Sequence, residues 1–207
     1  MAYKIAIIVG SLREGSINRK VARSMCAIRG DNLDCSVVEI GDLPLYNQDY
    51  DSAPQQPEQY VRFRDQLRAA DGILFCTPEY NRSVPGALKN AIDVGSRPYG
   101  HSVFDKKPAA VITASPGAIG GFGANHHLRQ SCVFLNMPMM AQPEAYLGNV
   151  SDDSFDADGC LKDGPLKDVV TKLAHAFHDW VDMIQRSRQL LAEDAAHRSQ
   201  QNQNEPA

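Results

Sequence analysis

The most suggestive group of polar side chains lies near the start of the chain, at residues 10–18. The sequence there is Gly-Ser-Leu-Arg-Glu-Gly-Ser-Ile-Asn, and it directly follows a short apolar run. Ser11, Ser16 and Asn18 supply hydroxyl or amide groups, and Arg13 supplies a positive charge. A helix beginning at the end of this loop would add unpaired backbone N–H groups and the positive end of its dipole. The combination predicts a site for a dianionic phosphate.

The same loop lacks two commoner nucleotide-binding motifs. It has no Gly-Lys-Ser/Thr ending, so it is not a triphosphate-binding loop, and the absence of G-x-G-x-x-G disfavours a dinucleotide site. The alternative is a turn in which Ser16 only caps the following helix. The phosphate interpretation therefore depends on what the other loops of the chain contribute.

A second candidate loop covers residues 77–86 and contains two prolines. Its sequence is Thr-Pro-Glu-Tyr-Asn-Arg-Ser-Val-Pro-Gly. Proline fixes the backbone angle φ, so Pro78 and Pro85 make the segment between them rigid. Tyr80 can stack on a flat heterocycle, and the backbone groups of residues 79–81 can meet ring heteroatoms. The alternative is a plain strand–helix connection in which Pro85 starts the helix.

A third candidate loop covers residues 115–123 and is rich in glycine. Four of its nine residues are glycine, in the sequence Ser-Pro-Gly-Ala-Ile-Gly-Gly-Phe-Gly. Glycine lets backbone N–H groups approach a ligand closely. Such donors could face the part of a ring that gains negative charge on reduction. The alternative is a flexible connector without a ligand.

Each of the three loops follows an apolar run that predicts a strand buried on both faces. Segments with helical spacing of apolar residues alternate with these runs. The predicted strands cover residues 3–9, 35–40, 72–77, 108–114 and 138–142, and the predicted helices cover residues 18–28, 58–70, 86–95, 122–135 and 165–186. We expect one domain over residues 1–186 and a frayed polar tail over residues 187–207.

Strands that alternate with helices predict an α/β fold, with a doubly wound parallel sheet between two layers of helices. In such sheets a ligand binds outside the carboxyl ends of the strands, where the winding direction switches. This rule points to the chain just after residues 10, 77 and 114, so we expect the three candidate loops to meet at one edge of the sheet.

Composition narrows the class of protein further. The chain has 207 residues, 43% of them hydrophobic, and a net charge of −4 from 21 basic and 25 acidic residues. This charge disfavours a nucleic-acid-binding protein. No apolar run reaches the ~20 residues that span a bilayer. The five cysteines are scattered and show no metal-ligand spacing, so we expect a cytoplasmic protein without a metal site.

The motifs together resemble the NADPH-dependent FMN reductase family. The pattern Gly-Ser-Leu-Arg-x-Gly-Ser-x-Asn after the first strand is similar to that family's flavin-phosphate loop. Residues 78–81, with 83–86 and 88–93 (Leu-Lys-Asn-Ala-Ile-Asp), resemble its second signature. The resemblance covers residues 3–185 and includes bacterial chromate- and quinone-reducing flavoproteins.

The resemblance implies a flavodoxin-like, five-stranded α/β/α fold that holds FMN noncovalently. It implies that FMN is bound by Ser11, Arg13, Ser16, Ile17 and Asn18 in the first loop, by Pro78, Glu79, Tyr80 and Asn81 in the second, and by Ser115 and Gly117 in the third. Within these sets, the first would bind the phosphate, the second would line the isoalloxazine ring, and the third would lie near its pyrimidine side. Arg82 departs from the aromatic or apolar residue that is frequent at this position.

The implied function is an oxidoreductase that transfers a hydride from NADPH or NADH, through FMN, to a small-molecule electron acceptor. Quinones, flavins, azo compounds and metal oxyanions are the acceptor classes. The flavin performs the chemistry, so no side chain is expected to be catalytic. The resemblance also implies a homodimer or homotetramer. The alternative function is a flavodoxin-like electron carrier that binds FMN and serves protein partners.

Overall fold

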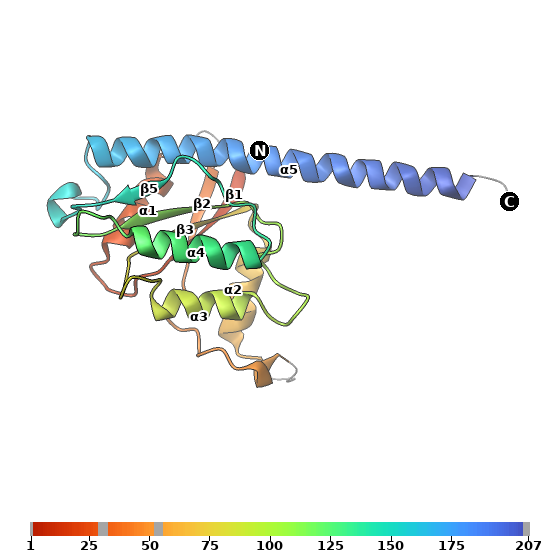
Figure 1. Cartoon of the computed structure of the whole chain (residues 1–207), viewed down its shortest axis with the longest axis horizontal. Helices are drawn as coiled ribbons and strands as arrows, with labels where there is room; N and C mark the ends of the chain where they lie inside the picture. The colour runs from red at the N-terminus through yellow and green to blue at the C-terminus, as the bar shows by residue number, and fades with distance from the viewer. Residues whose placement is uncertain (1, 29–32, 52–55, 205–207) are drawn as a thin grey trace.

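Five short apolar strands form the centre of the molecule. A computed structural model describes residues 2–28, 33–51 and 56–204. It arranges the strands as one parallel sheet in the order β2-β1-β3-β4-β5 (Figure 1). The strands are β1 (Tyr3–Val9), β2 (Leu33–Val38), β3 (Gly72–Thr77), β4 (Ala109–Ala114) and β5 (Ala145–Leu147). This order is that of the flavodoxin-like doubly wound folds, so the predicted fold class is confirmed.

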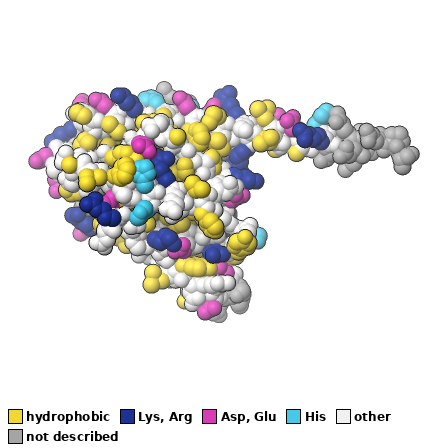
Figure 2. Space-filling view, viewed as in Figure 1, with side chains coloured by type: hydrophobic (Ala, Val, Ile, Leu, Met, Phe, Trp, Pro, Cys, Tyr) yellow, Lys and Arg dark blue, Asp and Glu magenta, His cyan; other side chains and the backbone are white. Residues whose placement is uncertain are grey.

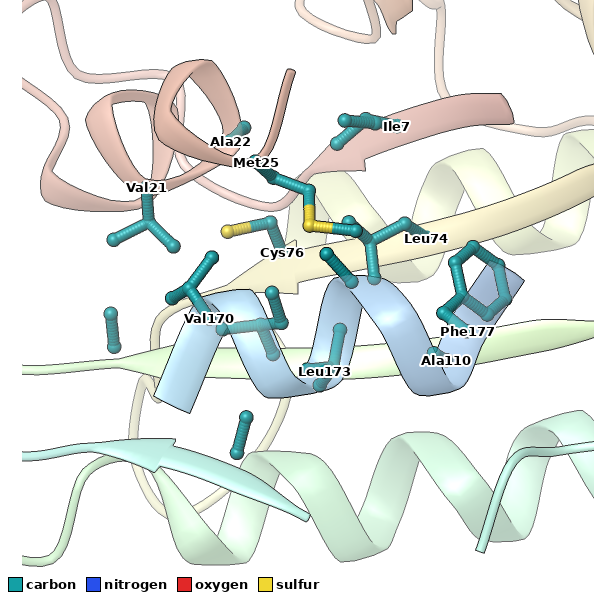
Figure 3. Packing of buried hydrophobic residues seen from close by; sticks show 14 of the residues in the cluster. Ile7, Val21, Ala22, Met25, Leu74, Cys76, Ala110, Val170, Leu173 and Phe177 are labelled. Atoms are coloured by element: carbon teal, nitrogen blue, oxygen red, sulfur yellow. The ribbon is translucent and has the colours of Figure 1, made fainter. Parts of the chain in front are cut away.

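Helices cover both faces of this sheet. They are α1 (Ile17–Ile28), α2 (Glu58–Arg68), α3 (Gly86–Gly95), α4 (Phe122–Phe134) and α5 (Pro165–Asn204). On one face, α1 and the first half of α5 pack through Met25, Leu173 and Phe177 (Figure 3). On the other, α2, α3 and α4 form a second apolar cluster. Every residue of β3 and β4 is buried, as expected for strands covered on both faces.

Two predicted strands lie at different positions in the structure. The second strand begins and ends two residues earlier than predicted, because residues 33–38 pair in register with Tyr3–Ile8. The prediction of a fifth strand at residues 138–142 is wrong, since only Met139 forms an isolated bridge there. Pro138 and Pro143 bracket this segment and cannot donate to a strand ladder. The fifth strand forms after them, at residues 145–147.

The last helix is much longer than predicted. The prediction ended it at residue 186, but α5 continues to Asn204 and projects beyond the sheet (Figure 1). The apolar periodicity ends near residue 186, and the packed part of the helix ends there too, since no later described side chain is buried. The following residues, including Leu190, Leu191 and Ala192, are strong helix formers, and they continue the helix without a core to pack on. None of the helices in the described part of the chain is long and apolar enough to cross a membrane.

Candidate functional site

The three candidate loops lie side by side at the carboxyl edge of the sheet. They follow β1, β3 and β4, which are neighbours in the strand order. The chain winds to one side of β1 to reach β2 and to the other side to reach β3, so the switch in direction falls at the first loop. This is the position at which doubly wound sheets bind their ligands.

A close approach of backbone joins the first loop to the second. The Gly10 N–H donates to the Cys76 carbonyl over 2.9 Å. A Cβ atom at Gly10 would lie 2.2 Å from Thr77 Oγ1 and 2.8 Å from Thr77 Cβ. Real Cβ atoms do not make such contacts, so the end of β1 can lie this close to the end of β3 only with glycine at residue 10.

The buried polar side chains of the first loop orient its backbone. Ser16 Oγ accepts a hydrogen bond from the Arg19 N–H over 3.2 Å, so it caps α1. Asn18 Nδ2 donates to the Ala114 carbonyl over 3.0 Å, which ties α1 to the end of β4. Ser11, Ser16 and Asn18 are all at most 4% exposed. These contacts direct the first turn of α1, with its unpaired N–H groups, toward the loop.

Positive charge lies beside this helix start. Arg13 is exposed, and Lys20 on α1 bonds Asp152 through its ammonium at 2.6 Å. This hydrogen bond lowers the pKa of the Asp152 carboxyl, and the Arg13 guanidinium adds a smaller effect in the same direction. Both cations therefore contribute positive potential at the edge of the molecule where α1 begins.

The second loop is a tight hairpin. The N–H and carbonyl groups of Tyr80 and Ser83 exchange two hydrogen bonds, of 2.9 and 3.0 Å. Asn81 and Arg82 between them both have positive φ, at 51° and 65°, as a turn of this geometry requires. The turn presents Tyr80 at the surface, 45% exposed.

Glu79 joins this hairpin to the third loop's helix. Its Oε2 accepts a hydrogen bond from the Ala124 N–H over 3.0 Å, and its Oε1 lies 3.3 Å from the Arg82 guanidinium. A Cβ at Gly123 would come within 2.9 Å of the same carboxylate. Glu79 therefore acts as a helix cap for α4, a position that favours a negative charge.

The third loop packs against β5. The Ser115 N–H donates to the Leu147 carbonyl over 2.9 Å, and Ser115 Oγ accepts from the Gly117 N–H over 3.1 Å. A Cβ at Gly148 would lie 2.3 Å from the Ala118 carbonyl oxygen. Gly120 and Gly121 both have positive φ, at 65° and 82°. The loop is therefore held against β5 by backbone hydrogen bonds and by close contacts that require glycine.

The predicted site residues fall into two groups. The buried or half-buried ones orient the loops, and the exposed ones are accessible from solvent. The first group contains Ser11, Ser16, Ile17, Asn18, Pro78, Glu79 and Ser115, and the second contains Arg13, Tyr80, Asn81 and Gly117. The structure thus brings all three loops together at one edge.

Sequence reasoning missed an aromatic cluster beside the third loop. The ring centroids of Phe122 and His126 lie 4.2 Å apart, and those of Phe122 and Tyr146 lie 5.3 Å apart. The Tyr146 hydroxyl is 3.1 Å from His126 Nε2. Burial raises the pKa of Tyr146 to about 12, with a further contribution from Glu144. The prediction placed the fifth strand at residues 138–142, so it did not place Tyr146 in the edge strand. In the structure Tyr146 is the middle residue of that strand, β5.

Other features of the described surface lie apart from these loops. Four surface cavities of about 350, 390, 460 and 430 Å³ are found elsewhere, three of them bordered by Arg97. No group of three or more His, Cys, Asp or Glu residues in the described ranges could hold a metal ion. The case for the loop edge therefore depends on its donors and backbone geometry.

The donors at this edge fit FMN. The first turn of α1, the hydroxyl of Ser11 and the charge of Arg13 suit a phosphate dianion. The close approach at Gly10 keeps this phosphate site next to the hairpin with Tyr80. The glycine-rich third loop, on the neighbouring strand, can offer backbone N–H groups to the edge of a ring.

Comparison with known proteins agrees with this geometry. Residues 3–152 match the family model of NADPH-dependent FMN reductase. A quinone reductase of Pseudomonas putida is 55% identical over 181 residues, which are 87% of this chain and 96% of that protein. A 2-hydroxy-1,4-benzoquinone reductase of a Burkholderia species is 43% identical over 181 residues, 87% of this chain and 97% of that protein.

A solved structure extends the similarity to the fold. FerB of Paracoccus denitrificans, described as a flavoenzyme NAD(P)H:(acceptor) oxidoreductase, superimposes with a TM-score of 0.82 at 38% identity. The match covers 88% of this chain and 98% of that chain. The family resemblance read from the loop motifs is thereby confirmed: the chain belongs to the NADPH-dependent FMN reductase family.

Proposed function

We propose that this protein is an NAD(P)H-dependent oxidoreductase that holds FMN at the carboxyl edge of its sheet and reduces quinones. One observation carries the proposal: the three loops of the family signature are joined to one another at adjacent strand ends, through Gly10, Asn18 and Glu79. The quinone part of the proposal is supported by the two relatives named as quinone and benzoquinone reductases.

In this proposal the first loop binds the phosphate of FMN. The N–H groups at the start of α1 donate to the phosphate oxygens, the Ser11 hydroxyl adds a donor, and Arg13 supplies the charge. Ser16 and Asn18 act mainly on the protein itself, because Ser16 caps α1 and Asn18 bonds Ala114. Their hydrogen bonds keep the donors in place before the ligand arrives, which lowers the entropic cost of binding.

The second and third loops hold the ring. Bound FMN supplies hydride chemistry between NAD(P)H and the acceptor. Tyr80 offers a ring face at the surface, and the backbone of residues 79–81 is held by the hairpin hydrogen bonds. Glu79 positions α4 through its bond to the Ala124 N–H, and we assign it no role in proton transfer. The N–H groups of Ser115, Gly117 and Gly120 are bonded within the protein, so the remaining backbone N–H groups of the loop at residues 115–121 would be the ones that stabilise negative charge on the ring.

We further propose a homodimer or homotetramer and a cytoplasmic location. Several large apolar side chains are strongly exposed, among them Phe134 and Tyr99, each 87% exposed, which is typical of surfaces that pair with a partner. The location is supported by the buried free thiols of Cys76 and Cys132, which suit a reducing compartment. Burial raises the pKa of the Cys132 thiol to about 12, so it is unreactive.

An acceptor panel tests the function directly. Purified protein is assayed with NADH and with NADPH, with and without added FMN, against a benzoquinone, free FMN, an azo dye and ferricyanide. We expect sustained NAD(P)H consumption with the quinone in the absence of any protein partner. Failure to oxidise either nucleotide, together with tight FMN retention, would instead support the electron-carrier alternative.

Replacing Arg13 tests the phosphate site. Arg13→Ala removes one charge-assisted contact, so we expect FMN binding to weaken about tenfold at low salt. The difference should shrink at 0.5 M NaCl because salt screens an exposed charge. Fluorescence titration of FMN measures both values. Arg68→Ala, which removes an exposed arginine from α2, is the matched control, and equal FMN affinity in the two variants would remove Arg13 from the site.

Replacing Glu79 separates a positioning role from proton transfer. Glu79→Gln keeps an acceptor for the Ala124 N–H, so we expect near-native turnover and an unchanged pH profile. Glu79→Ala removes the cap and should lower the free energy of unfolding by about 1 kcal/mol. Urea denaturation and pH–rate profiles measure these effects. A pH profile that loses one ionisation in Glu79→Gln would show that this carboxyl carries a proton in the reaction.

A further inference from the structure

The last part of α5 is a helix without a core of its own. Among the described side chains Val181 is the last buried one, and every side chain from Arg186 to Arg198 is exposed. Figure 1 shows this segment, the α5 projection (residues 186–204), extending well beyond the sheet and the other helices. Most helix stability in proteins comes from packing an apolar face, so a contact along one side would stabilise this segment.

One face of α5 carries an apolar stripe that begins at Met183 and runs into the projection. Met183, Leu190 and Leu191 are 52%, 62% and 66% exposed. They are separated by seven and eight residues, two turns of helix, so they share one face. Figure 2 shows apolar side chains on the projection next to side chains of both charges. Single exposed leucines are ordinary, but these three apolar side chains share a face of a segment whose side chains from Arg186 to Arg198 are all exposed.

The charges beside the stripe fit a second copy of this chain; within one copy, Arg186 Nε lies 2.8 Å from Asp182 Oδ2 and Gln189 Nε2 donates to Glu193 Oε1. Arg186 and Glu193 carry opposite charges. They are seven residues apart, so they lie on the same side of the stripe. When two identical helices pair antiparallel, the same side of each faces the other. Arg186 of one copy then lies level with Glu193 of the second copy, and twofold symmetry repeats this pair. In a parallel pair, this side of one helix would face the opposite side of the other, so Arg186 and Glu193 would not meet across the seam.

A groove at the base of the projection extends this surface. It has a volume of about 390 Å³ and is lined by α5 residues Ile184, Ser187 and Arg188 together with Val133 and Met137. Val133, on its rim, is 73% exposed. In an antiparallel pair centred near Leu190, the second copy's helix runs toward this groove. The contact would therefore continue from the projection onto the body of the protein.

We propose that the α5 projection pairs antiparallel with the same segment of a second copy of this chain. Met183, Leu190 and Leu191 supply the apolar seam, and the two Arg186–Glu193 pairs set its direction. The surface is separate from the three loops, so the pairing brings two FMN sites into one assembly without closing either. This inference does not depend on which acceptor the enzyme reduces.

The apolar seam is tested by the double variant Leu190→Gln/Leu191→Gln in the full-length protein. Both side chains are exposed, so the fold should be unaffected. We expect light scattering after size exclusion, at tens of micromolar protein, to give a particle mass about half that of the wild type. Val61→Gln, at another exposed apolar position, should keep the wild-type mass. Equal masses for the wild type and the double variant would overturn the proposal.

Charge reversal tests the antiparallel direction. Arg186→Glu and Glu193→Arg each place like charges opposite one another, so each should weaken self-association about tenfold by analytical ultracentrifugation. The combined variant restores opposite charges and should return to within about threefold of the wild type. Lys172→Glu, an exposed α5 residue outside the projection, is the control. Additive weakening in the combined variant would exclude this pairing. The pairing would also be excluded if the wild-type protein bound anionic vesicles while its mass in solution equalled that of the Leu190→Gln/Leu191→Gln variant.

Discussion

The candidate site depends on one close approach of backbone, between the end of β1 and the end of β3. Gly10 lies where a Cβ atom would be 2.2 Å from the Thr77 hydroxyl oxygen. This contact sets the loop proposed to bind phosphate next to the hairpin that follows β3. The Asn18 hydrogen bond to Ala114 then ties the same helix start to the end of β4. Two contacts thus arrange three loops that are distant in sequence.

The polar side chains of the site act mostly on the protein. Ser16, Asn18, Glu79 and Ser115 each hydrogen-bond a backbone group of a site loop or of a neighbouring element. Such contacts hold the loops in one conformation, so less order has to be created when a ligand binds. In the proposed site, the groups left to contact FMN are mainly backbone N–H groups, together with Arg13 and Tyr80. This division suits a family in which the cofactor performs the chemistry.

The sequence predicts what depends on local pattern and misses what depends on distant contacts. Fully buried strands such as Gly72–Thr77 are continuous apolar runs, so the sheet and its ligand-binding edge could be predicted. The contact between Glu79 and the start of α4 joins residues 45 positions apart and has no local signature. The fifth strand has only three residues, too few to show a recognisable pattern of apolar residues. The residues beyond 186 have high helix propensity but no buried side chains. The prediction ended the helix where the apolar periodicity typical of a packed helix ends, so it missed this extension.

An experimental structure of the protein with FMN bound is the most direct test of the account. It should place the phosphate within hydrogen-bond distance of the first turn of α1 and of Ser11. It should also place the isoalloxazine ring between the Tyr80 hairpin and the loop at residues 115–121. FMN bound elsewhere, for example in the cavities beside Arg97, with the loop edge filled by side chains, would contradict the central claim.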